Sequence, residues 1–69
     1  MDIRISTAIS SHLSDAQHEI SFAPKKANNR INFVKWILNR YPETEVHVKE
    51  EKLNEEYRAF LKHWGLEEL

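Results

Sequence analysis

Two prolines bracket the stretch that most constrains the fold of this chain, residues 23–42, which read APKKANNRINFVKWILNRYP. Pro24 suits the first turn of a helix, because the N–H that it lacks has no intrahelical partner there. Pro42 cannot continue a helix and disfavours the helical conformation of the residue before it. Arg40 complements the negative end of the helix dipole. The sequence therefore predicts a central helix over residues 24–41.

The predicted central helix carries apolar side chains on two sides. At about 100° per residue, one broad face collects Ala27, Ile31, Val34, Ile37, Leu38 and Tyr41. Phe33 and Trp36 fall on the far side of the helix, and Asn29 and Arg40 lie near them. Two interpretations are open. Either neighbouring helices pack on both sides, or the two aromatic rings form an exposed contact site.

The N-terminal segment also shows a helical period. Its apolar residues recur at spacings of three and four, namely Ile5, Ile9, Leu13, Ala16 and Ile20, which predicts a helix near residues 6–21. Ser14 and Gln17 match a capping box, so a second helix starting at Ser14 is an alternative. The uninterrupted spacing across Leu13 favours one helix. The link of residues 21–23 is so short that the first two helices should be antiparallel neighbours.

After Pro42 the chain alternates between apolar and polar residues, with Val46 and Val48 as the apolar positions. This pattern is typical of a strand or of an extended connector over residues 42–48. A strand would need a partner, which Ile3 and Ile5 or a second copy of the chain could supply. We favour a plain extended linker.

The last segment predicts an amphipathic helix over residues 49–64. Its narrow apolar stripe consists of Leu53, Tyr57, Phe60, Leu61 and Trp64. Glutamates crowd its first half and Lys62 lies near its end, and both placements complement the helix dipole. Gly65 followed by Leu66 is typical of a Schellman cap that ends a helix.

Together these segments predict an all-α fold: one domain over residues 1–69, built as a compact three-helix bundle. The expected core lies on the apolar stripes and consists of Ile5, Ile9, Leu13, Ala16, Ile20, Ile31, Val34, Ile37, Leu38, Tyr41, Leu53, Tyr57, Phe60, Leu61 and Trp64. A core this small rarely supplies more than about 3–5 kcal/mol. With no cysteine, neither a disulfide nor a thiolate metal site can add to it. We therefore expect oligomerisation to contribute.

The sequence argues against several classes of function. It shows no signal-peptide pattern and no run of about 18 apolar residues, so we expect a soluble, cytoplasmic protein without membrane contact. Gly65 is the only glycine, so no glycine-rich phosphate loop is present. His12, Asp15 and His18 are spaced too widely around a helix to converge on a metal. We expect no catalytic residues, no cofactor and no bound metal.

Two functions remain. We favour a non-catalytic protein–protein interaction module that forms a homodimer, with an interface made by Phe33, Trp36, Asn29 and Arg40. The alternative is a nucleic-acid-binding module that uses the central helix, because that helix carries five cations and no acid: Lys25, Lys26, Arg30, Lys35 and Arg40. Against it, the net charge of the chain is −1, whereas nucleic-acid-binding domains are usually basic.

Overall fold

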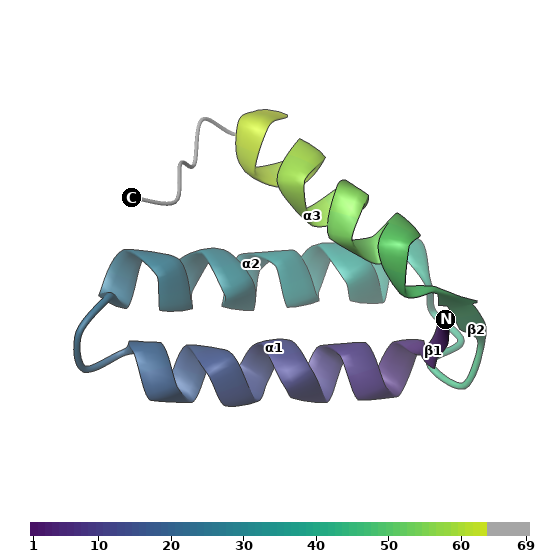
Figure 1. The fold of residues 1–69 in the computed structure, drawn as a ribbon, viewed down its shortest axis with the longest axis horizontal. Coiled ribbons are helices and arrows are strands. Elements are labelled where there is room, and N and C mark those ends of the chain that lie inside the picture. The colour runs from purple at the N-terminus through teal and green to yellow at the C-terminus, as the bar shows by residue number, and fades with distance from the viewer. Residues whose placement is uncertain (64–69) are drawn as a thin grey trace.

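The computed structural model of the chain describes residues 1–63. Within them the elements follow the order β1 (Asp2–Arg4), α1 (Ile5–Glu19), α2 (Pro24–Arg40), β2 (His47–Lys49) and α3 (Glu50–His63). Helices α1 and α2 form an antiparallel hairpin, and α3 packs across this hairpin and diverges from α2 toward its C-terminal end (Figure 1). The predicted all-α, three-helix architecture is confirmed. The expected helix end at Trp64 and cap at Gly65 lie outside the described residues.

The helix boundaries agree with the sequence signals. Helix α1 runs through Ser14 without a break, so the prediction of one helix is confirmed. Helix α2 begins at Pro24 and ends at Arg40, just before the second proline. At its end the Tyr41 amide still donates to the Ile37 carbonyl oxygen at 2.7 Å, and Tyr41 itself leaves the helical region. The two prolines therefore set both ends of the central helix.

The two strands pair into a short antiparallel ribbon, with Ile3 opposite Val48. The plain linker that we favoured from the sequence is thus wrong at residues 47–49, and the alternative pairing with Ile3 is correct. The physical reason lies at the start of α1, where the first amides of a helix have no intrahelical partner. The chain leading into β2 satisfies them, because Ile5 donates to the Val46 carbonyl and Ser6 to the Thr44 carbonyl, at 2.9 and 2.8 Å.

The core is centred on Phe33, whose side chain is 0% exposed. Around it lie buried residues from all three helices: Ile5, Ala8, Ile37, Leu53, Phe60 and Leu61. The Phe33 ring also packs against Tyr57 of α3, with 4.8 Å between the ring centroids, and stacks on Trp36 at 5.5 Å. The expectation that Phe33 could form an exposed contact is therefore wrong. Of the two interpretations of the central helix, packing on both sides is correct.

The position of α3 also corrects the expected core. Leu13, Ile20 and Leu38 were expected inside, yet their exposed fractions are 44%, 61% and 46%. Helix α3 packs on the side of α2 that presents Phe33 and Trp36, because these rings offer the largest apolar surface for a third helix to bury. The opposite side of the hairpin is left without a covering element in residues 1–63.

Candidate interaction surfaces

One surface of the hairpin, which we call the α1–α2 face, presents large apolar side chains to solvent. It consists of Ile9 and Leu13 on α1, Ile20 directly after α1, and Ile31, Val34 and Leu38 on α2. In each half of the hairpin two members lie seven residues apart, Leu13 with Ile20 and Ile31 with Leu38, a spacing that keeps side chains in line on a helix. Val34 is buried, Ile9 and Ile31 are half-buried, and the other three are exposed.

The direction of this face follows from helical rotation. On α1, Leu13 lies about 100° around the axis from His12, whose ring packs against α3. On α2, Leu38 lies about 140° around the axis from Phe33, which also packs against α3. Because the helices are antiparallel, both rotations carry the side chains to the same side of the hairpin. The α1–α2 face therefore points away from α3.

Charge is sparse on the α1–α2 face, where the exposed Lys35 lies one helical turn from both Ile31 and Leu38. Between its apolar residues on α1 lie Ser10 and Gln17, and Ala27 extends the apolar row on α2. None of these residues is charged, although 30% of the chain is. Such depletion of charge is a property of the buried centres of protein interfaces and not of ordinary solvated helix surfaces.

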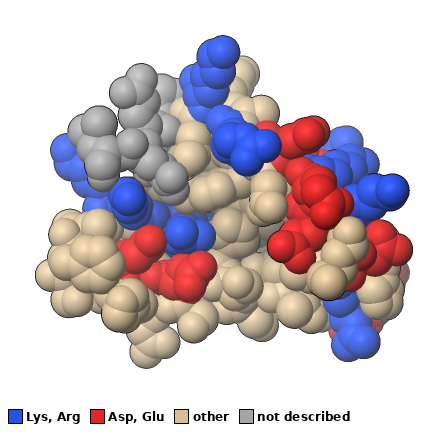
Figure 2. Space-filling view, viewed as in Figure 1, with Lys and Arg blue, Asp and Glu red and all other residues tan. Residues whose placement is uncertain are grey.

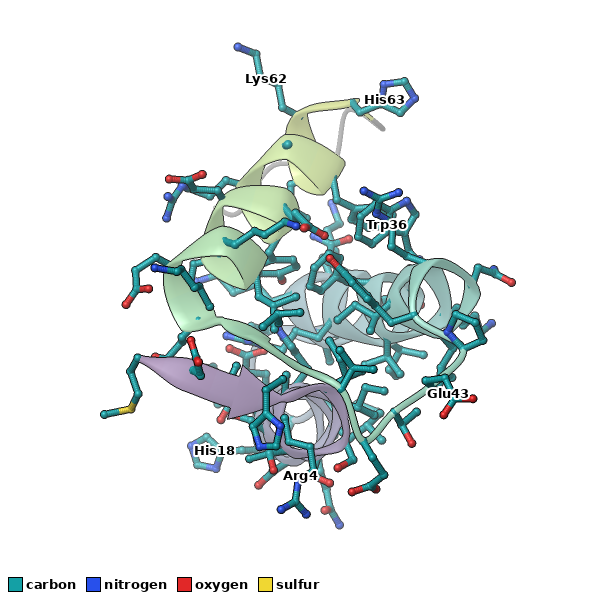
Figure 3. All side chains as sticks on the ribbon, turned by 90° about the vertical axis from the view of Figure 1, so that its right-hand side faces the viewer. Arg4, His18, Trp36, Glu43, Lys62 and His63 are labelled. Carbon is teal, nitrogen blue, oxygen red and sulfur yellow. The ribbon has the colours of Figure 1, made fainter. Side chains whose placement is uncertain are left out.

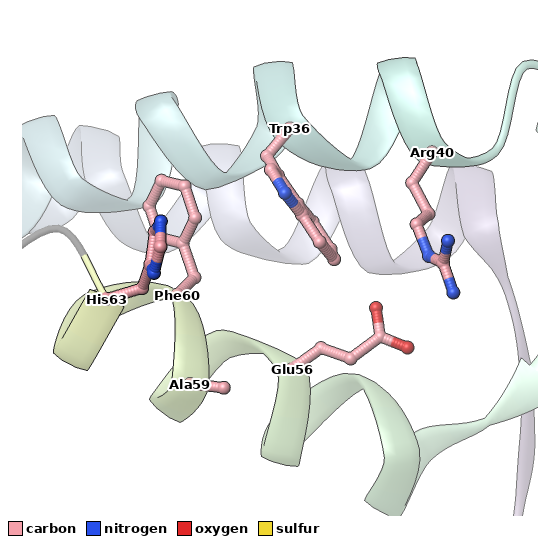
Figure 4. Close-up of a pocket in the computed structure, with 6 residues that line it drawn as sticks. All are labelled: Trp36, Arg40, Glu56, Ala59, Phe60 and His63. Atoms are coloured by element: carbon pink, nitrogen blue, oxygen red, sulfur yellow. The ribbon is translucent and has the colours of Figure 1, made fainter.

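A pocket of about 420 Å³ lies between α2 and α3, on another side of the molecule. It is lined by Trp36, Arg40, Glu56, Ala59, Phe60 and His63 (Figure 4), and we call it the Trp36 pocket. Trp36 is half-buried and forms one wall. In Figure 4 the Arg40 and Glu56 side chains lie together on one side of the indole ring, and Phe60 and His63 lie on the other. The pocket thus combines an aromatic wall with groups of opposite charge.

Glu56 is fixed within this pocket by one of its two oxygens. The Tyr41 hydroxyl donates a hydrogen bond to Glu56 Oε1 at 3.0 Å. Burial, together with this carboxylate, raises the pKa of Tyr41 above its ordinary value. Glu56 Oε2 is buried as well, and it has no hydrogen-bond partner among the described residues. A buried acceptor without a partner costs free energy and marks a place where a donor would bind favourably.

A group of charged residues joins α1 to α2 on the side of the pair that faces α3. Arg30 Nε donates to Glu19 Oε1 at 2.7 Å, and Arg30 Nη1 lies 3.5 Å from Asp15 Oδ2. Arg30 Nη1 also lies 3.2 Å from His12 Nδ1. Since a guanidinium can only donate, that histidine nitrogen is the acceptor. The hydrogen bond from Arg30 lowers the pKa of the Glu19 carboxyl below its ordinary value. This group is structural, because its members satisfy one another.

The four residues expected to form a dimer interface are not brought together on the surface. Phe33 and Asn29 are buried, so neither can contact a second molecule in this structure. Trp36 and Arg40 do reach the surface, where both line the Trp36 pocket. For Phe33 the physical reason is that α3 packs on its side of α2 through Phe60, which leaves Trp36 half-buried at the edge of the contact.

The five cations of α2 do not form one patch. Arg30 is only 19% exposed and is held by Glu19 of α1, while Lys25, Lys35 and Arg40 are exposed at different rotations around the helix. The salt bridges among the described residues do not join these cations to the glutamates of α3. Figure 2 shows basic and acidic side chains intermixed at both ends of the viewed face, with an uncharged band between them.

The described residues contain no group of three or more His, Asp or Glu side chains placed to hold a metal ion. None of the helices in residues 1–63 is both long enough and apolar enough to cross a membrane.

Sequence reasoning missed the α1–α2 face because it assigned every apolar stripe to the core. The available signal was the pair of seven-residue repeats, Leu13 with Ile20 and Ile31 with Leu38. Searches against protein-family models, curated proteins and solved structures found no match to this chain.

Proposed function

We propose that this chain is a non-catalytic helical interaction module that forms a homodimer through the α1–α2 face. The observation that supports the proposal is the exposure of Leu13, Ile20 and Leu38 on a face where charge is sparse. Transfer of apolar surface out of water contributes roughly 25 cal/mol per Å². Contiguous exposed apolar surface of this kind is typical of sites of association.

A second copy of the chain is the occupant that the face itself favours. In a two-fold dimer the same patch lies on both partners, so a face must be complementary to itself. A charged face would repel its own copy, whereas the uncharged apolar surface of Leu13 and Leu38 does not. Two hairpins packed in this way would form a four-helix arrangement, in which apolar stripes of facing helices interdigitate.

The size of the face is compatible with a weak dimer. A helix of 15 residues such as α1 is about 22 Å long, and two adjacent helices are roughly 20 Å wide. The face therefore presents roughly 450 Å² per copy and about 900 Å² per dimer, close to the ~1,000 Å² that marks a biological interface. We expect a dissociation constant in the micromolar range and not an obligate dimer.

The alternative function, nucleic-acid binding by the basic helix α2, has less support. The cations diverge around the helix, and Arg30 is already engaged by Glu19. Phosphate contacts would make any such binding fall steeply with salt. A gel shift with single- and double-stranded DNA and RNA at low salt tests this alternative. A salt-sensitive complex that is lost in a Lys25→Glu, Lys35→Glu double variant would support it.

Sedimentation velocity over a concentration series tests the proposed dimer. We expect the average mass of the wild-type chain to rise toward that of a dimer at micromolar to millimolar concentration. Leu38→Asp should hold the chain as a folded monomer, because it places a charge in the centre of the interface. Asn39→Asp is the matched control, since it adds the same charge to the neighbouring exposed position of the same helix turn. A wild-type chain that stays monomeric throughout contradicts the proposal.

A further inference from the structure

The Trp36 indole ring has one covered face and one that looks into the pocket. Phe33, three residues earlier on α2, stacks on the ring with an interplanar angle of 13°. Arg40, four residues later, lies beyond the ring in the other direction along the helix. The side of the indole that faces Arg40 is the side on which Glu56 also lies (Figure 4). A continuous stack thus begins inside the core and ends at an aromatic surface in the pocket.

The spacing along α2 matches the thickness of one further ring. Four residues of helix rise about 6 Å, and a planar group between two others needs roughly 7 Å, which is two contacts of about 3.5 Å. Arg40 carries a planar guanidinium that stacks readily on aromatic rings. It is exposed, its Cζ atom lies 5.9 Å from the centroid of the neighbouring Tyr41 ring, and it forms no ion pair within residues 1–63. Trp36 and Arg40 are therefore placed to enclose a flat group from both faces.

Glu56 supplies the polar contact at the edge of that space. Its Oε1 accepts from the Tyr41 hydroxyl, which fixes the carboxylate, and its buried Oε2 has no donor among the described residues. An ionised carboxylate only accepts hydrogen bonds, so the missing group must be a donor. The side-chain view of Figure 3 places Trp36 at the surface beside α3, so a ligand can reach it from solvent.

We propose that the Trp36 pocket binds a nucleobase of the guanine type, stacked between Trp36 and Arg40, with its ring N–H and amino group donating to Glu56. Unstacked bases are commonly recognised in this way, by an aromatic ring or a guanidinium plane on the base face and a hydrogen bond on its Watson–Crick edge. Guanine presents two adjacent donors on that edge. The corresponding edge of adenine has a single amino donor beside an acceptor nitrogen, which a carboxylate repels. The volume of about 420 Å³ accommodates a nucleoside.

This site is separate from the proposed dimer interface, because Trp36 and Leu38 lie about 160° apart around α2. The proposal of dimer formation and the proposal of base binding can therefore be tested independently of each other. The base has two sources with the same chemistry, a free nucleoside or an unpaired base in a single strand. The experiment below compares both.

Binding is measured by titrating guanosine into the full chain in a Trp64→Phe background, so that Trp36 is the only fluorescent indole. We expect stacking to quench the fluorescence saturably, with adenosine binding at least about tenfold more weakly. A guanine-containing RNA hexamer is titrated in parallel. Binding tenfold tighter than guanosine identifies a single strand as the source, and equal or weaker binding identifies the free nucleoside.

Three variants test whether Glu56 is the group that accepts the hydrogen bonds from guanosine. Glu56→Gln should weaken guanosine binding at least about tenfold, because it removes the charged acceptor. Tyr41→Phe should largely preserve binding, since it leaves Glu56 Oε2 in place. Glu55→Gln, at an exposed neighbouring position, should change nothing. Circular dichroism checks that each variant is folded. The proposal is overturned if guanosine does not bind at millimolar concentration, if adenosine binds equally well, or if Glu56→Gln binds like the parent.

Discussion

Arg30 Nε donates a hydrogen bond to Glu19 Oε1 at 2.7 Å, and this contact fastens the last turn of α1 to the first half of α2. Both side chains are largely covered, with exposed fractions of 14% for Glu19 and 19% for Arg30. The contact closes the end of the hairpin opposite the β1–β2 ribbon (Figure 1). The two ends of the hairpin are therefore held differently, one by backbone pairing and one by a charged pair.

Glu19→Gln should lower the free energy of unfolding by about 1–3 kcal/mol, because it leaves a mostly covered guanidinium without its charged acceptor. Glu45→Gln is the matched control. Glu45 pairs with Arg4 at 3.5 Å but is 72% exposed, so its loss should change stability by less than about 0.5 kcal/mol. Urea denaturation at neutral pH measures both variants. Equal effects of the two substitutions would contradict a special role for Glu19.

The same carboxyl should make stability depend on pH. The folded pKa of Glu19 lies below its ordinary value of 4.5, chiefly because of the hydrogen bond from Arg30. The unfolded chain therefore binds the proton more readily, so the contribution of Glu19 is complete at neutral pH and is lost as the pH falls below about 4.5. Urea denaturation from pH 7 to pH 3 should show a smaller loss of stability in Glu19→Gln than in the wild type. If stability falls equally with pH in the variant and in the wild type, other carboxyl groups cause the pH dependence of stability.

Phe33 should be the most sensitive apolar position that we have described. Phe33→Ala is expected to cost about 3–5 kcal/mol, which is comparable to the whole stability of a chain of this size. Phe33→Leu keeps most of the volume and should leave a folded but weakened protein. Phe22→Leu is the matched control, because Phe22 is exposed in the turn between α1 and α2. Thermal unfolding followed by circular dichroism should show a clear loss for Phe33→Leu and almost none for Phe22→Leu.

Much of the fold could be predicted because its signals are local. Pro24 and Pro42 act on their own stretch of backbone, and the repeat of Ile5, Ile9 and Leu13 requires only helical geometry. The β1–β2 pairing was harder, since Ile3 and Val48 are far apart in the sequence. Nothing local decides whether such a segment is a strand or a linker until its partner is placed.

The side of α2 that α3 covers could not be predicted. Helix α2 has apolar groups on both sides, and the local sequence does not say which of them α3 covers and which of them α1 covers. Packing of α3 on Phe33, through Tyr57 and Phe60, is favoured over packing on Leu38, because burial of an aromatic ring removes more apolar surface from water. That outcome places Phe33 in the core and exposes Leu38. It also explains why Phe33 cannot belong to the expected interface, whereas the expectation of self-association remains a proposal.

The most direct test of the proposed dimer is an isotope-filtered NMR experiment on a mixture of labelled and unlabelled chains at millimolar concentration. We predict intermolecular contacts at the methyl groups of Leu13, Ile31 and Leu38, and their loss in Leu38→Asp but not in Asn39→Asp. Intermolecular contacts confined to other surfaces, or none at a concentration where the chain is folded, would contradict association through the α1–α2 face.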